Sequence, residues 1–251
     1  MNFNILRFDT IDSTNTEAAN QARQGADEGV CIIAREQTAG RGRHGRNWVS
    51  EKDSGLYFSV VLRPKLETRF LPLITLMTGI AVYDTLKEFG LKPDIKWVND
   101  VLIGEKKICG ILAETVETAR GFAVIVGIGI NLTNHNFPDE IAETATSIQA
   151  VLSAPGAVAA GDLEATLTKY ISYWYAVLDR KKGPKELVDE WQRRSSYFSG
   201  KNVRVTLANE IFEGVTDGIG ENGALRVKRS DGSVTIVQAG DVERLRTVSH
   251  E

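Results

Sequence analysis

The sequence between Lys96 and Glu114 reads KWVNDVLIGEKKICGILAE, and it contains two apolar runs separated by Gly104-Glu105. The first run, VLI, and the second, which continues as KKICGILAETVE, are predicted to pair as a β-hairpin. DIKWV at 94–98 leads into the hairpin as a strand, and GFAVIVGIGINL at 121–132 follows it as the next strand. Strands that follow one another this closely predict a sheet with antiparallel neighbours in the middle of the chain.

The residues before this segment switch between helical and extended patterns. Thr14 and Glu17 have the spacing of a capping box, and the alanine-rich segment after Thr14 is predicted to be a helix that ends at Gly25. Two apolar runs are predicted strands, VCIIARE at 30–36 and LYFSVVLR at 56–63. RFLPLITLMTGIAVYDTLKEF at 69–89 repeats its apolar residues at helical spacing, so it is predicted to be a long, largely buried helix.

The pattern changes again towards the C-terminus. Two or three helices are expected between about 138 and 195, the clearest being DLEATLTKYISYWYAVLDR at 162–180. After Ser199-Gly200, short alternating runs are separated by Asn-Gly and Asp-Gly turns, which is typical of antiparallel strands. We therefore expect an α+β fold in two domains: a mixed sheet with flanking helices over 1–198, and a small β-barrel over 199–251.

Composition excludes several classes of protein. The 251 residues are 42% hydrophobic and 25% charged, which excludes a disordered, collagen-like or disulfide-stabilised chain. A net charge of −3 argues against a protein that coats nucleic acid. The longest apolar run, FAVIVGIGI at 122–130, is shorter than the roughly 20 residues that a membrane span needs. Cys31 and Cys109 lie in apolar runs and are expected to be buried, unreactive thiols, so we expect a soluble, intracellular protein.

Residues 40–45, GRGRHG, match the pattern G-x-G-x-x-G but not its structural context. A dinucleotide-binding fingerprint must open a helix, whereas RNWVSEKDSG after it has no helical apolar face and leads into a strand. Glycines let backbone N–H groups approach an anion, and Arg41, Arg43 and Arg46 add bidentate donors for phosphate or carboxylate. From the loop alone, an anion-binding loop, a solvated basic loop and a contact with a nucleic acid backbone all remain open.

Four motifs occur together in an order that resembles the biotin protein ligase family. They are Ser13-Thr14-Asn15, REQTAGRGRHGRNW at 35–48, KWVNDVLIGEKKICGILAE at 96–114 and VGIGINL at 126–132. The resemblance covers nearly the whole chain and implies a class II synthetase-like catalytic domain of the biotin and lipoate ligases, followed by an SH3-like barrel. It further implies a cytoplasmic ligase that uses MgATP to convert biotin to biotinyl-5′-AMP and transfers the biotinyl group to a lysine of a biotin carboxyl carrier protein.

The resemblance also assigns roles to individual residues. It implies catalytic roles for Arg43 and Lys107 and a metal-binding role for Asp100. Its biotin-binding residues correspond to Ser13, Thr14, Asn15, Gln37, Arg41, Gly42, Arg43, Lys107, Gly110 and Gly129. Its nucleotide-binding residues correspond to Trp48, Lys96, Asn99 and Asn131. No nucleophilic side chain is needed, because the biotin carboxylate attacks ATP and the acceptor amine then attacks the adenylate.

Other functions remain as alternatives. A lipoate-type ligase has a related fold. The loop between the predicted strands 30–36 and 56–63, which contains GRGRHG at 40–45 and is called the arginine-glycine loop below, argues against it. A protein of a different class, a nucleic-acid-binding module, would use the same loop and the barrel. Ser13 lies so near the start of the sequence that no DNA-binding domain, and hence no operator binding, is expected ahead of it. Pairing of sheet edges into a homodimer is a further expectation.

Overall fold

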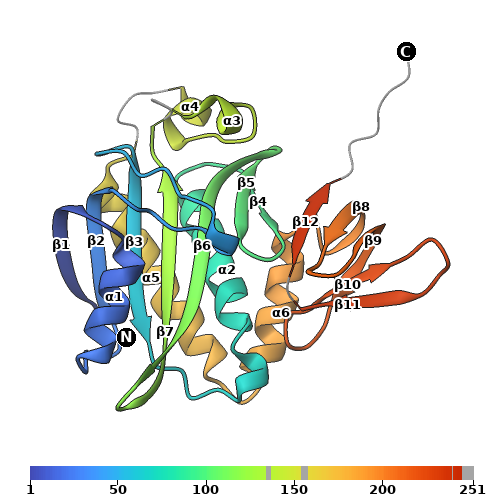
Figure 1. Cartoon of the computed structure of the whole chain (residues 1–251), viewed down its shortest axis with the longest axis horizontal. Helices are drawn as coiled ribbons and strands as arrows, with labels where there is room; N and C mark the ends of the chain where they lie inside the picture. The colour runs from blue at the N-terminus through green and yellow to red at the C-terminus, as the bar shows by residue number, and fades with distance from the viewer. Residues whose placement is uncertain (134–136, 154–157, 239, 245–251) are drawn as a thin grey trace.

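A seven-stranded mixed sheet forms the centre of the computed structural model, which describes residues 1–133, 137–153, 158–238 and 240–244 (Figure 1). Its strands are β1 (Asn4–Ile11), β2 (Val30–Gln37), β3 (Gly55–Leu62), β4 (Pro93–Lys96), β5 (Asp100–Ile103), β6 (Lys106–Thr118) and β7 (Gly121–Asn131). The spatial order is β1-β2-β3-β7-β6-β5-β4. The β1–β2 pair is parallel, and the other neighbours are antiparallel. The predicted hairpin is thus β5–β6, and β7 pairs with β6 along nearly its whole length.

Helices cover both faces of this sheet (Figure 1). They are α1 (Thr14–Arg23), α2 (Leu73–Glu88), α3 (Asp139–Ala142), α4 (Ile148–Leu152), α5 (Ala160–Leu178) and α6 (Gly183–Arg194), with 3₁₀ turns at Arg43–Gly45 and Thr68–Phe70. Helix α1 packs on β2, β3, β6 and β7, whereas α2 and α5 pack together on the opposite face. The segment Thr68–Glu88 is apolar and long enough to cross a membrane, but it lies mostly buried in the core. Its composition is that of a central core helix.

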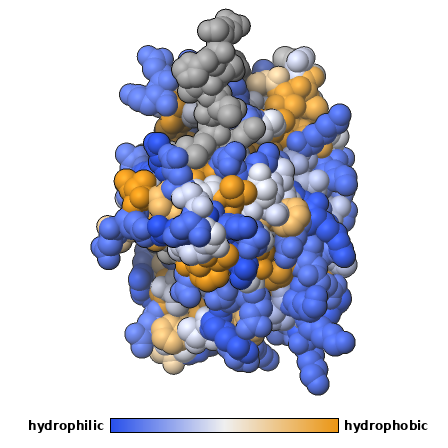
Figure 2. Space-filling view, turned by 90° about the vertical axis from the view of Figure 1, so that its right-hand side faces the viewer, coloured by the Kyte–Doolittle hydropathy of each residue, from blue (hydrophilic) through white to orange (hydrophobic). Residues whose placement is uncertain are grey.

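A second, five-stranded antiparallel sheet follows α6 (Figure 1). It consists of β8 (Ser199–Thr206), β9 (Ile211–Ile219), β10 (Leu225–Lys228), β11 (Val234–Val237) and β12 (Asp241–Arg244), in the order β11-β10-β9-β8-β12. The side of the molecule on which it lies is mostly hydrophilic, with small separate apolar patches (Figure 2). Gly223, at φ +83°, lies against Leu73 and Leu76 of α2 and accepts a 2.9 Å hydrogen bond from Trp97 Nε1. This contact fixes the small sheet beside the large one.

The architecture expected from the sequence is confirmed, since a mixed sheet with flanking helices precedes a small antiparallel sheet consistent with an SH3-like fold. Three local predictions were wrong or incomplete. Strand β1 was missed because its half-exposed residues alternate weakly. The Thr14–Glu17 capping box does not form: Ser13 is the N-cap, its side chain makes no capping bond, and the Thr14 hydroxyl donates to Gln37 instead. Within 138–153 and 158–195, the described parts of the region where two or three helices were expected, there are four helices, two of them short (α3 and α4).

Both cysteines are buried, as expected. Burial raises the pKa of the Cys31 thiol to about 12, and burial also raises the pKa of the Cys109 thiol. Because only the thiolate is nucleophilic, both residues remain protonated and unreactive at neutral pH.

Core packing on α2 gives a test of this fold. Ile80 of α2 is fully buried in the hydrophobic core, so Ile80→Ala should lower the free energy of unfolding by about 2–5 kcal/mol. Lys87→Ala, at an exposed position of the same helix, should change it by less than about 0.5 kcal/mol. Urea denaturation followed by circular dichroism measures both, and equal effects of the two substitutions would contradict the packing of α2.

Candidate functional site

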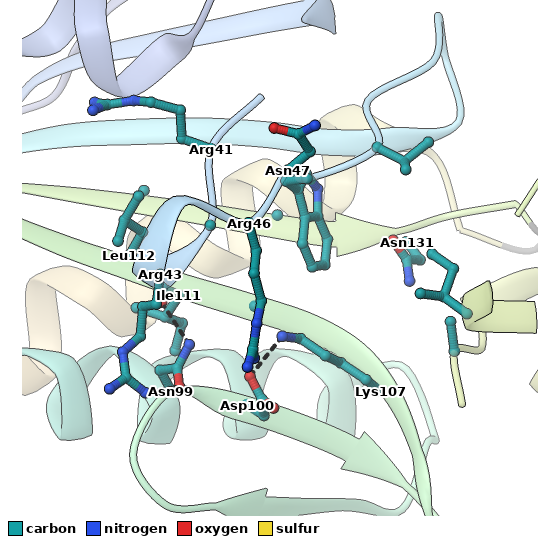
Figure 3. Close-up of a pocket in the computed structure, with 18 of the residues that line it drawn as sticks. Arg41, Arg43, Arg46, Asn47, Asn99, Asp100, Lys107, Ile111, Leu112 and Asn131 are labelled. Carbon is teal, nitrogen blue, oxygen red and sulfur yellow. Dashed lines mark hydrogen bonds and ion pairs between the residues drawn. The ribbon is translucent and has the colours of Figure 1, made fainter. Parts of the chain in front are cut away.

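A cavity of about 450 Å³ opens where α1, β6, β7, the arginine-glycine loop, the α3 segment and β12 meet (Figure 3). All fifteen residues singled out from the sequence line it. They are Ser13, Thr14, Asn15, Gln37, Arg41, Gly42, Arg43, Trp48, Lys96, Asn99, Asp100, Lys107, Gly110, Gly129 and Asn131. These residues lie up to 118 positions apart in the sequence (131 − 13). The fold therefore brings the four motifs together at one place.

Glycines on β6 and β7 form the floor of the cavity. A Cβ atom on Gly129 would lie 2.5 Å from the Trp48 indole, and one on Gly110 would lie 2.8 Å from the same ring. A Cβ atom on Gly127 would lie 2.1 Å from Asn15 Oδ1. Real side chains do not approach so closely, so the absence of side chains here allows α1 and the loop to reach the sheet.

Hydrogen bonds connect the start of α1 to the loop. Gln37 Oε1 accepts hydrogen bonds from the Thr14 N–H at 2.8 Å and from the Thr14 hydroxyl at 3.0 Å, and Gln37 Nε2 donates to Ser50 Oγ at 2.7 Å. The buried Ser50 hydroxyl in turn donates to the Trp48 carbonyl at 3.0 Å. The Gln37 amide therefore has a fixed orientation at this end of the cavity.

Two arginines attach the loop at different places. The Arg41 guanidinium donates two hydrogen bonds to Glu114 of β6, at 3.1 and 2.8 Å, and points away from the other labelled cationic side chains (Figure 3). Arg43 donates to Asn99 Oδ1 at 3.0 Å and to the Gly240 carbonyl at 3.1 Å, just before β12. The loop is thereby held against both sheets.

Lys107 of β6 and Asp100 of β5 form an ion pair of 2.7 Å beside Asn99, the partner of Arg43 (Figure 3). The main chain of Lys107 is fixed by its N–H bond to the Thr144 carbonyl and by its carbonyl, which accepts from the Thr146 N–H. Its ammonium lies 5.4 Å from the centre of the Trp48 ring. An ammonium has three donors, so Lys107 can bind an anion in the cavity while it keeps Asp100 as a partner.

The described lining carries more positive than negative side chains. Five are cationic, namely Arg41, Arg43, Arg46, Lys96 and Lys107, against the carboxylates Asp100, Glu140 and Asp241. Asn131 donates to the Thr146 carbonyl at 2.9 Å, which leaves its carbonyl oxygen as an acceptor. Tyr57 also lines the cavity, and burial raises the pKa of its phenol, which donates to the Glu51 carbonyl. Chemically, the cavity suits a ligand with an anionic centre and polar groups at both ends.

Several residues that build the site were missed from the sequence. Ser50 and Glu114 lie inside or beside the quoted motifs, but their partners are recognisable only in three dimensions. Asp241, which forms an ion pair with Arg46, is 195 positions away in sequence, and no sequence pattern relates the two.

Comparisons with known proteins agree with this arrangement. The biotin/lipoate A/B protein ligase family matches residues 7–131, and the biotin protein ligase C-terminal domain matches residues 198–245. The bifunctional ligase/repressor BirA of Bacillus subtilis is 34% identical over 97% of this chain and 74% of its own length. The biotin–[acetyl-CoA-carboxylase] ligase of Mycobacterium tuberculosis is 33% identical over 93% of this chain and 86% of its own. The structure of Aquifex aeolicus biotin protein ligase with biotin and ATP superimposes with a TM-score of 0.84, at 28% identity, over 97% of this chain and 99% of that one.

The glycine floor predicts a specific effect of Gly129→Ala. The added methyl group would lie 2.5 Å from the Trp48 ring, so the indole must move and its fluorescence emission should change. In a Trp48→Phe background the same substitution should leave the emission unchanged, which separates Trp48 from the other tryptophans. Gly161→Ala, where a Cβ meets open space on α5, is the matched control. An unchanged emission for Gly129→Ala would contradict the contact.

Proposed function

Because this chain belongs to the biotin protein ligase family, we propose that it activates biotin with ATP to biotinyl-5′-AMP and transfers the biotinyl group to a lysine of a biotin carboxyl carrier protein. The observation that carries the proposal is the single cavity lined by every residue that the family resemblance singles out. In this proposal residues 1–198 are the catalytic domain, and residues 199–251 are a barrel that contributes Asp241 and Val242 to the cavity wall.

Biotin would lie with its ureido group at the start of α1. Ser13, Thr14 and Asn15 are buried there, and the Gln37 amide is fixed beside them. A ureido group has two N–H donors and a carbonyl acceptor, and hydroxyl and amide groups match both kinds. Gly110 and Gly129 would face the rest of the ligand along the floor, beside the Trp48 indole that packs on both glycines, while Arg41 and Gly42 shape the loop above it.

The reaction centre would lie between Arg43 and Lys107. A biotin carboxylate oxygen attacks the α-phosphorus of ATP, the bond to the β-phosphate oxygen breaks, and pyrophosphate leaves. Both reactants are anions, so the two cationic side chains lower the barrier by stabilising the charge that develops on the α-phosphate. In the second step the uncharged acceptor amine attacks the carbonyl carbon of the mixed anhydride, AMP leaves, and an amide forms.

The nucleotide would extend towards Lys96, Asn99 and Asn131, with Trp48 covering the adenylate. Among the described residues no group of three or more His, Cys, Asp or Glu side chains could hold a metal ion alone. Mg²⁺ usually binds proteins through one or two carboxylates together with substrate phosphates, so Asp100 beside Lys107 fits it once ATP is present. There the ion would withdraw charge from the phosphates.

The proposed reaction also implies an acceptor protein and a place of action. The named relatives point to a carboxylase carrier protein as the acceptor. We further propose that the chain acts in the cytoplasm, has no nucleic-acid partner and pairs with a second copy through a sheet edge.

Exchange of labelled pyrophosphate into ATP tests the function directly. The proposal predicts exchange that requires biotin and is not supported by lipoate. Exchange with lipoate alone would favour the lipoate-type ligase, which the first family model also includes. If neither acid supports exchange, both ligase functions are rejected, and the result favours the nucleic-acid-binding module.

Lys107 provides a second test. Lys107→Ala removes a charge-assisted contact to the developing anion, so it should raise the barrier to adenylation by about 3 kcal/mol, or roughly a hundredfold in rate. Lys106→Ala is the matched control, because Lys106 is the exposed neighbour on the same strand. Single-turnover formation of biotinyl-5′-AMP measures both. Equal rates of adenylate formation for the two variants would show that Lys107 does not stabilise the reacting phosphate.

A further inference from the structure

Glu114 occupies a position that the reaction itself does not require. Its side chain extends from β6 on the same sheet face as Leu112 and the glycine floor, towards the start of α1. It accepts three hydrogen bonds: two from Arg41 and one, at 2.8 Å, from Asn15 Nδ2. One carboxylate therefore binds both the arginine-glycine loop and the first turn of α1.

The Glu114 carboxylate determines how the Asn15 amide is turned. Carboxylate oxygens only accept hydrogen bonds, so the NH₂ group of Asn15 must face Glu114 and Asn15 Oδ1 must face the Ser59 hydroxyl, 2.6 Å away. The same NH₂ group donates to the Leu112 carbonyl at 3.3 Å. Because Gly127 has no side chain, it leaves room for Asn15 Oδ1 above the sheet. Both N–H donors of the Asn15 amide are thus engaged with protein groups, and its Oδ1 keeps one lone pair for a further donor.

Glu114 also determines where the loop lies at one of its ends. Arg41 forms a fork-shaped pair with both carboxylate oxygens, and in the main chain it pairs with Asn47 across the loop. The other attachment of the loop, through Arg43, is made to different elements. If the Glu114 contact were lost, the loop would keep its attachment near β12 and its main-chain bonds to Ile11 and Asp12, but the Arg41 side chain would no longer be held to β6.

We propose that Glu114 is a positioning residue that couples the position of Arg41 in the arginine-glycine loop to the orientation of Asn15 at the biotin end of the cavity. The inference rests on the proposed function. It predicts that the Arg41 contact and the correct arrangement of the biotin end are lost together. Because the carboxylate contacts neither reacting group, it acts through Arg41 and Asn15, so its loss affects substrate affinity and intermediate retention more than chemistry.

Glu114→Gln tests the coupling. Three N–H donors converge on the two oxygens of Glu114, whereas a glutamine offers one oxygen and places an NH₂ group against a donor. We expect the Kd for biotin and the dissociation rate of biotinyl-5′-AMP to rise about tenfold each. The effect should fall on KM for biotin rather than on kcat of pyrophosphate exchange. Glu117→Gln, an exposed residue of the same strand, is the matched control.

A double-mutant cycle separates this role from a merely structural one. If Glu114 acts through Arg41, Arg41→Gln should cost about as much as Glu114→Gln, and the double variant should be less than about twofold worse than either. Multiplicative effects, or a Glu114→Gln variant that matches Glu117→Gln, would overturn the inference.

A second variant at the same position tests the inference if the first one misfolds. If Glu114→Gln does not fold, Glu114→Asp keeps the charge but shortens the side chain by one methylene, and it should show the same rise in KM. Failure of the wild-type chain to bind biotin would instead reject the proposed function, and this inference with it.

Discussion

The site depends on the close approach of two side chains to a strip of sheet that carries no side chains. Trp48 and Asn15 contact β6 and β7 only because Gly110, Gly127 and Gly129 are glycines; a Cβ atom at any of them would come within 2.8 Å of one of these two side chains. This space lets the loop and α1 form walls around the cavity. The sheet supplies this floor together with Lys107 and Asp100, and the loop supplies Arg43.

Electrostatics then gives the cavity its preference for anions. Arg43 reaches it from the arginine-glycine loop and Lys107 from β6, and each already has an acceptor within the protein, Asn99 for Arg43 and Asp100 for Lys107. A cation that is held by a neighbour before the ligand arrives loses little conformational freedom when it binds a phosphate. This preorganisation suits a reaction in which two anions must meet.

Much of this could be predicted from the sequence, for identifiable reasons. Strands β5 to β7 were found because their apolar runs are dense and separated by Gly104-Glu105 and Gly121. The site residues were found because they cluster in four short motifs. Strand β1 was missed because its pattern is weak and its partner β2 lies beyond α1. The contacts of Glu114 and Asp241 were missed because each joins segments that are more than 70 positions apart.

If this cavity holds biotin and the α-phosphate of ATP at once, a crystal structure with biotinyl-5′-AMP will show the adenylate inside it. We expect the ureido group to lie beside Thr14 and Gln37, the acyl phosphate to lie between Arg43 and Lys107, and the ligand to cross the glycine floor. A complex in which the adenylate lies outside this cavity, or in which Lys107 contacts only Asp100, would contradict this placement of the ligand.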